Sequence, residues 1–216
     1  MKKIVNEGKA SNKLGYWLLF GLDRGVSVPV KQYWKEINES SKRVTSLMHS
    51  YWHEHSDWGN WQFWFLLLCL LVPLIVLLIK LDRNRIFEIL FFGYTVHMIW
   101  TYTDLALIRQ GYIDHYYFLM PFLPQAFGTT ASILPVSFML LYQYCTNQEK
   151  PFILWTTGLS ALFAFVLAPI EIFTGLVSIT KGLTIVHLFF LDFTISMVAY
   201  GMAKFIKNHY EARQSA

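Results

Sequence analysis

Five apolar blocks dominate this sequence, and each has about the 20 residues that a transmembrane helix needs. They cover residues 61–79, 86–108, 127–145, 152–173 and 183–203. At 1.5 Å per residue, a helix of that length crosses about 30 Å of hydrocarbon. Charged residues make up only 15% of the chain, against roughly 25% in soluble domains. The sequence therefore predicts an all-α, polytopic membrane helical bundle with about five transmembrane helices within residues 61–205.

The N-terminal segment, residues 1–60, is more polar and is expected to lie outside the hydrocarbon. A short apolar patch at residues 16–22 ends at Asp23 and Arg24, so it is too short to span and is expected at the interface. From residue 30 to residue 52, apolar side chains recur at helical spacing between Lys and Glu residues. This pattern predicts an amphipathic helix lying on the membrane interface or across the mouth of the bundle.

Basic residues near the ends of the blocks predict the orientation. Seven lie on one side of the expected bundle and four on the other. The seven are Lys80, Arg83, Arg85, Lys150, Lys204, Lys207 and Arg213, and the four are Lys42, Arg43, Arg109 and Lys181. We therefore expect a multi-pass plasma-membrane protein with an external N-terminus and a cytoplasmic tail at residues 206–216. The net charge of +4 lies mainly outside the blocks and suits a membrane surface, and no nucleic-acid-binding module is found.

Ionisable side chains within the blocks are costly in hydrocarbon, by roughly 2.5–3.5 kcal/mol at mid-helix, and normally face protein or water. On the second block, Tyr94, His97, Thr101 and Asp104 are spaced by three, four and three residues, which predicts one polar helix face pointing into the bundle. On the fifth block, Asp192, Ser196 and Tyr200 follow one another at intervals of four residues, and His187 precedes them. The fourth block carries one acid, Glu171.

With the predicted orientation, most of these acids and imidazoles fall in the outer half of the membrane, which indicates an outward-facing pocket with aromatic walls. The candidate catalytic residues are Asp104, Asp192, Glu171, His97, His187 and Tyr94. The candidate ligand contacts are Trp100, Thr101, Tyr102, Ile172, Phe189, Ser196 and Tyr200. The alternative is that these polar groups pair with one another and serve helix packing alone. The connection at residues 109–125 is rich in aromatic residues and proline, and it is expected to form an ordered lid or re-entrant segment.

A second polar cluster precedes the first block. His49, His53 and Asp57 are spaced by four residues, so on a helix they would share a face, which is compatible with zinc. Histidines at a membrane boundary are also ordinary, and no cysteine supports a metal site. No cofactor is therefore expected, and zinc at this cluster is the lesser alternative.

The function that these features favour is acid/base chemistry on a lipid-soluble, isoprenoid-like substrate. In this hypothesis Asp104 or Asp192 donates a proton. His97 or His187 orients the reacting group or accepts a proton, and Tyr94 assists the transfer. The alternatives are a proton- or cation-coupled transport or binding protein, and a non-catalytic accessory or sensory membrane protein. The expected partners are membrane lipids, a hydrophobic small molecule and a second copy of the chain.

Several stretches resemble a family of small, uncharacterised integral membrane proteins of spore-forming Gram-positive bacteria. They are WGNWQFWFLL, LDRNRIFEILFFG, the Asp104 position, ILPVSFMLLYQY and FAFVLAPIEIFTGL. The resemblance implies five helices and a plasma-membrane location, and it implies no reaction. The chain departs from the family pattern at two positions where that pattern has acids: Ala168 precedes the proline of the fourth span, near Glu171, and Thr130 stands before the third.

Overall fold

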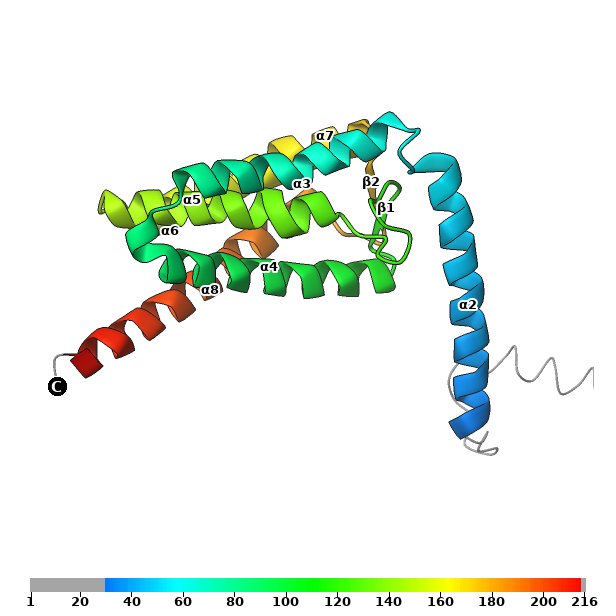
Figure 1. Cartoon of the computed structure of the whole chain (residues 1–216), viewed down its shortest axis with the longest axis horizontal. Helices are drawn as coiled ribbons and strands as arrows, with labels where there is room; N and C mark the ends of the chain where they lie inside the picture. The colour runs from blue at the N-terminus through cyan, green and yellow to red at the C-terminus, as the bar shows by residue number, and fades with distance from the viewer. Residues whose placement is uncertain (1–29, 215–216) are drawn as a thin grey trace, which may run out of the picture. The chain divides into compact units, whose positions relative to one another are not determined.

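The computed structural model describes residues 30–214, and the side chains of residues 30–209 (Figure 1). The chain divides into two units, one ending at Val44 and one beginning at Thr45, and each is described by itself. The apolar patch at residues 16–22 lies outside the described residues. The mostly helical character confirms the all-α prediction in its coarse form, and the bundle lies within the second unit.

Helix α2, Val30–His55, corresponds to the predicted amphipathic helix and has no buried residue. In the first unit its apolar stripe is open to the surroundings at Val30, Trp34 and Ile37. On its polar side Lys35 and Glu39 are one helical turn apart, with 3.9 Å between the charged atoms. The helix is therefore confirmed, and its place on a membrane surface stays a prediction.

The second unit contains the helices that correspond to the apolar blocks. They are α3 (Trp61–Lys80), α4 (Ile86–Arg109), α5 (Leu134–Asn147), α6 (Phe152–Leu162), α7 (Ala168–Phe173) and α8 (Ile185–Gln214). A short 3₁₀ segment, η1 (Arg83–Arg85), precedes α4. Two π-helical segments interrupt the regular geometry: η2 (Thr129–Ile133) leads into α5, and η3 (Phe163–Leu167) joins α6 to α7. Residues 152–173 therefore form one helical run.

Three helices are long and apolar enough to cross a membrane: α3, the run Phe152–Phe173, and α8 over Ile185–His209. Helix α4 is long enough, but the polar residues along it lower its mean hydropathy, and α5 has only 14 residues. Helix α8 continues past residue 203 to Gln214, so most of the predicted tail is helical. The membrane character is thus supported by three helices, whereas five were predicted.

A two-stranded antiparallel sheet, which the sequence analysis did not predict, closes one end of the bundle (Figure 1). Strand β1 (Ile113–His115) pairs with β2 (Val177–Ile179), with Asp114 opposite Ser178. The backbone amide of Tyr116 extends the ladder by donating to Leu176, at 3.0 Å. The predicted lid at residues 109–125 is therefore an ordered segment, and strand β2, in the segment after α7, pairs with it.

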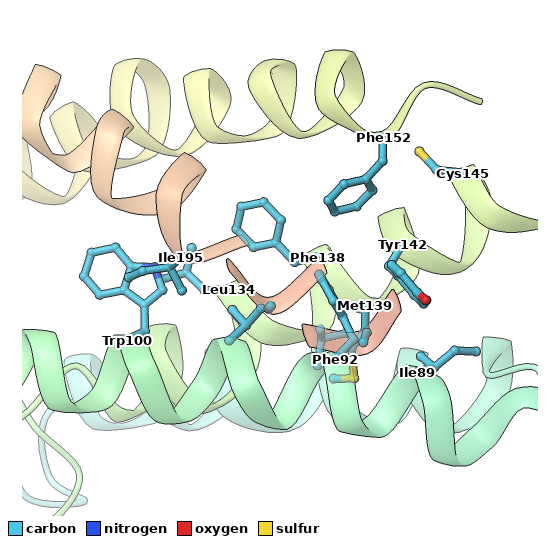
Figure 2. Close-up of a cluster of buried hydrophobic side chains, with 14 of the residues drawn as sticks. Ile89, Phe92, Trp100, Leu134, Phe138, Met139, Tyr142, Cys145, Phe152 and Ile195 are labelled. Atoms are coloured by element: carbon cyan, nitrogen blue, oxygen red, sulfur yellow. The ribbon is translucent and has the colours of Figure 1, made fainter. Parts of the chain in front are cut away.

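The core of the second unit lies where α4 packs against α5 and α8. Two stacked aromatic pairs fill it, Phe92 on Tyr142 and Phe152 on Tyr200, each with 4.5 Å between ring centroids. Figure 2 shows Phe92, Tyr142 and Phe152 together in this cluster. Gly93 lets α4 approach α5 closely, because a Cβ at this position would lie 2.1 Å from the sulfur of Met139. This core fixes the relative positions of α4, α5 and α8, and α4 and α8 carry Asp104 and Asp192.

Candidate functional site

A cavity of about 440 Å³ lies at the end of the bundle that carries the two-stranded sheet. Its volume falls in the range of roughly 300–1,000 Å³ that is usual for small-molecule pockets. Its walls come from α3, α4, η2, the run η3–α7, β1, β2 and α8, and most of them are apolar. The cavity therefore brings together segments that are up to about 130 residues apart in the chain, from Trp61 to Asp192.

Three carboxyl groups from three different helices line this one cavity. Asp104 comes from the last turns of α4, Glu171 from α7, and Asp192 from the first half of α8. All three were candidate catalytic residues, and the structure brings them together. Hydrogen bonds hold each carboxyl group through a different partner, so the three environments differ.

Asp104 pairs with a histidine of the lid. Its Oδ1 lies 3.0 Å from Nε2 of His115, which β1 positions, and both side chains are less than a tenth exposed. The second oxygen, Oδ2, is buried and has no hydrogen-bond partner among residues 30–209. Buried polar atoms are almost always paired, so an unpaired carboxylate oxygen in a cavity wall identifies a place for a ligand or water. Asp104 is therefore the one of the three whose second oxygen is buried without a partner in the described part of the chain.

His115 lines the cavity and contacts Asp104, but the sequence analysis did not name it as a candidate. It lies in the predicted lid, eleven residues after Asp104 and past the end of the helix. Helical spacing carries no information across that boundary. The usable signal is that His115 is the one imidazole in the segment 109–125.

Asp192 is oriented by the indole of Trp100, whose Nε1 donates to Oδ1 at 2.9 Å. Both residues are buried and both line the cavity. Ser196, one turn later, donates its hydroxyl to the backbone oxygen of Asp192 at 2.7 Å. Ser196 thus bonds within α8 and is not among the residues lining the cavity, whereas Trp100 does line it.

Glu171 accepts a longer hydrogen bond, 3.4 Å, from the hydroxyl of Thr129 in η2. Both π-helical segments contribute to the lining, η2 with Thr130 and Ile133 and η3 with Ala164 among others. The wider turn of a π-helix re-aims side chains, and such turns are frequent at functional sites. Here the two π-helical turns face the same cavity.

Other candidate catalytic residues lie away from the cavity wall. Nδ1 of His97 lies 3.0 Å from the backbone oxygen of Thr130 and 3.3 Å from the hydroxyl of Thr101, so both side chains serve packing of α4 on η2. His187 is exposed and accepts from the amide of Thr184 at 3.2 Å, which stabilises the start of α8.

The expectation that Tyr94 points into the bundle is wrong. Its side chain is 61% exposed and lines a separate groove near the other end of α4, together with Arg85 and Lys207. At 100° per residue, the ten residues from Tyr94 to Asp104 leave the two side chains about 80° apart around the helix. The polar face is therefore wider than the spacing suggested, and only its far end reaches the cavity.

Among the candidate ligand contacts, Trp100 and Ile172 line the cavity. The others lie elsewhere. Tyr102 is exposed, Phe189 packs against Phe165 with 5.8 Å between centroids, and Tyr200 belongs to the aromatic core. Thr101 binds His97 and Ser196 bonds within its own helix, as described above.

The possible zinc cluster is not assembled. His49 and His53 are exposed, and α2 ends at His55, so Asp57 is not on the helix. Asp57 instead accepts from the amide of Gly59 and the side chain of Asn60, and 3.9 Å separates it from His53. No group of three His, Cys, Asp or Glu residues that could hold a metal ion occurs within the described part of the chain.

Thr130 and Ala168, the two positions at which the chain departs from the resembled family, both line the cavity. The chain matches no protein-family model, no curated protein and no solved structure.

Proposed function

We propose that the protein binds a lipid-soluble small molecule in the cavity and carries out acid/base chemistry on it with the Asp104–His115 pair. One observation carries this proposal: Asp104 lines an otherwise largely apolar cavity, and its buried Oδ2 has no hydrogen-bond partner among residues 30–209. A carboxyl group and an imidazole in contact can pass a proton between them, and the free oxygen can give it to or take it from a substrate. His115 takes the orienting role that the sequence suggested for His97 or His187.

The remaining carboxyl groups support this assignment by contrast. Trp100 caps Asp192, and Thr129 caps Glu171. Caps of this kind are what a purely structural role predicts. Asp104 differs from both because its partner, His115, can itself accept or give up a proton, and because its second oxygen is buried without a partner among residues 30–209. We therefore assign the proton transfer to it and the shaping of the pocket to the other two.

We further propose that α4 and the η2–α5 segment cross the membrane beside the three strongly apolar helices, which makes five spans. Helix α4 packs against α5 and α8. The segment formed by η2 and α5 contains 19 residues, which is about 28 Å of helix. Basic residues support a cytoplasmic C-terminus: Arg85 and Lys207 both approach Glu88 at the end away from the sheet. By the positive-inside rule that end is cytoplasmic and the sheet end external.

The test compares the lipids of bacterial membranes that contain wild-type protein, Asp104→Asn, or Asp114→Asn as the matched control. Asp114 is an exposed carboxyl on the same lid as His115, so its replacement removes a charge without touching the cavity. We expect mass spectrometry to detect a lipid-soluble species whose amount changes when the wild-type protein or Asp114→Asn is present in the membrane. Its amount should not change when Asp104→Asn is present. Identical lipid profiles for wild type and Asp104→Asn, at equal protein levels, would remove the proposed chemistry.

Transport of a proton or a cation is the second candidate, because three carboxyl groups share one cavity. Purified protein in sealed vesicles distinguishes the two. A proton flux that depends on Asp104 and needs no added lipid-soluble compound would favour transport over catalysis.

A further inference from the structure

We infer that the ligand of this cavity is a lipid-soluble amine, with an apolar body and a protonated nitrogen beside Asp104, and that it enters from the bilayer between α3 and α7. The inference rests on the proposed function in one respect, that the cavity binds a ligand. It names the chemical class of that ligand and its route.

The charge of the lining favours a cation. The side chains around the cavity include three carboxyl groups and one imidazole, and neither lysine nor arginine occurs among its described lining residues. Asp104 is 3% exposed, and its Oδ2 has no donor among the side chains and backbone that the structure describes. A buried carboxylate oxygen lacking a donor is costly, and an ammonium group supplies both the opposite charge and N–H donors. A carboxylate or phosphate head would meet repulsion at the same place.

The walls suit the rest of such a molecule. Trp61, Trp100, Tyr117 and Phe163 contribute aromatic rings to the lining, and the remainder is chiefly aliphatic. Aromatic faces attract cations, more strongly where water is excluded. An apolar body can therefore fill the cavity while the nitrogen lies between the carboxyl groups and the rings.

The opening faces lipid. Five lining residues are also exposed, and they mark the mouth: Trp61 and Phe65 on α3, Ile170 and Ile172 on α7, and Thr174 directly after α7. Helix α3 packs mainly against η2 and α5, whereas α7 packs mainly against η3 and β2. Both helices belong to strongly apolar spans, so a gap between them leads to the bilayer. Exposed tryptophans near the start of α3, Trp58, Trp61 and Trp64, place this mouth near the membrane boundary, where amine heads reside.

Cys69 provides a native reporter. It lies on α3, lines the cavity and is partly exposed, whereas Cys145 is buried and is not a lining residue. In full-length Cys145→Ser protein in lipid nanodiscs, the rate of Cys69 alkylation by N-ethylmaleimide is followed by intact-mass spectrometry. The probes are dodecylamine, dodecanol and dodecanoate at pH 7.5, which share a chain and differ in the head group.

We expect dodecylamine to protect Cys69 at about tenfold lower concentration than dodecanol, a difference of roughly 1.4 kcal/mol, with dodecanoate weakest. Asp104→Asn should remove this preference, and Asp114→Asn should keep it. Equal protection by dodecylamine and dodecanol in the wild-type background would overturn the amine class and leave the cavity as a ligand site. If none of the three probes slows alkylation, the cavity binds no such ligand, and the proposed function fails with the inference. The comparison of the three probes needs no substitution in the cavity.

The route is tested separately with Ile170→Trp, which narrows the mouth, and Ile153→Trp, which adds the same ring to an exposed site on α6. We expect the first to slow alkylation of Cys69 several-fold and the second to leave it unchanged. Equal rates in the two variants would show that a small molecule does not reach Cys69 between α3 and α7, and would overturn the proposed route.

Discussion

Nε2 of His115 lies 3.0 Å from Oδ1 of Asp104, which joins the lid to the end of α4 inside the bundle. Helix α4 ends at Arg109, and the chain then turns back through Gly111, whose φ of +66° favours glycine, to bring β1 over the cavity. The pair thus depends on the turn between the two residues and on β2, which pairs with β1.

Replacing His115 with leucine should destabilise the protein, because it leaves both oxygens of Asp104 buried without a donor. The expected loss is about 1–3 kcal/mol, measured as a lower melting temperature in detergent by tryptophan fluorescence. The double variant Asp104→Leu/His115→Leu should be more stable than the single one, since it removes both partners. A single variant as stable as wild type would show that the pair contributes nothing to folding.

Asp104→Asn should leave folding largely intact while abolishing the change in membrane lipids. Asparagine keeps the shape and an oxygen acceptor but cannot exchange a proton at neutral pH. Expression level and the size-exclusion profile in detergent report folding, and lipid mass spectrometry reports function. Aggregation of this variant would instead favour the structural role for Asp104 that the sequence left open.

Glu88→Gln should destabilise the opposite end of the bundle. Glu88 accepts two hydrogen bonds from Arg85 and one from Tyr142, and Lys207 lies 3.7 Å away. The hydrogen bond to Glu88 raises the pKa of Arg85, which reflects how strongly this carboxylate favours the charged guanidinium. Neutralising the partly buried partner should cost about 1–3 kcal/mol in thermal unfolding. Glu54→Gln, at an exposed site, is the control and should change little.

Gly93→Ala should lower stability by about 1–3 kcal/mol, because the added methyl group overlaps the buried side chain of Met139. Adding Met139→Ala should recover part of the loss. Gly201→Ala, on α8 with nothing within 4 Å, serves as the matched control and should be neutral or stabilising by up to about 1 kcal/mol. If Gly93→Ala behaves like Gly201→Ala, then α4 and α5 are not in close contact.

The proposed topology predicts opposite labelling of two single-cysteine variants. In a background without Cys69 and Cys145, Asp114→Cys on the lid should react with a membrane-impermeant maleimide on intact cells. Gln148→Cys, in the exposed turn after α5, should react only after the membrane is opened. The reverse pattern would invert the orientation and place the cavity in the cytoplasmic half.

Sequence reasoning located the helices well because hydrophobic length is a local property. The ends of α3 and of the run 152–173 fall within one residue of the predicted blocks. Sequence reasoning predicted less of the structure where two segments distant in the chain come into contact. The strand pair β1–β2 has three residues in each strand, too few for a periodic signal, and the π-helical turns at η2 and η3 carry no distinct pattern.

The sequence by itself determined that this chain forms apolar helices with a few acids and imidazoles inside them, since composition and block length are enough for that conclusion. Only the tertiary structure decided which of those groups meet. Asp104, Glu171 and Asp192 share a cavity because α4, α7 and α8 end or pass at the same end of the bundle. Tyr94 and His187 do not, because packing between helices, rather than spacing along one helix, sets the direction in which a side chain faces.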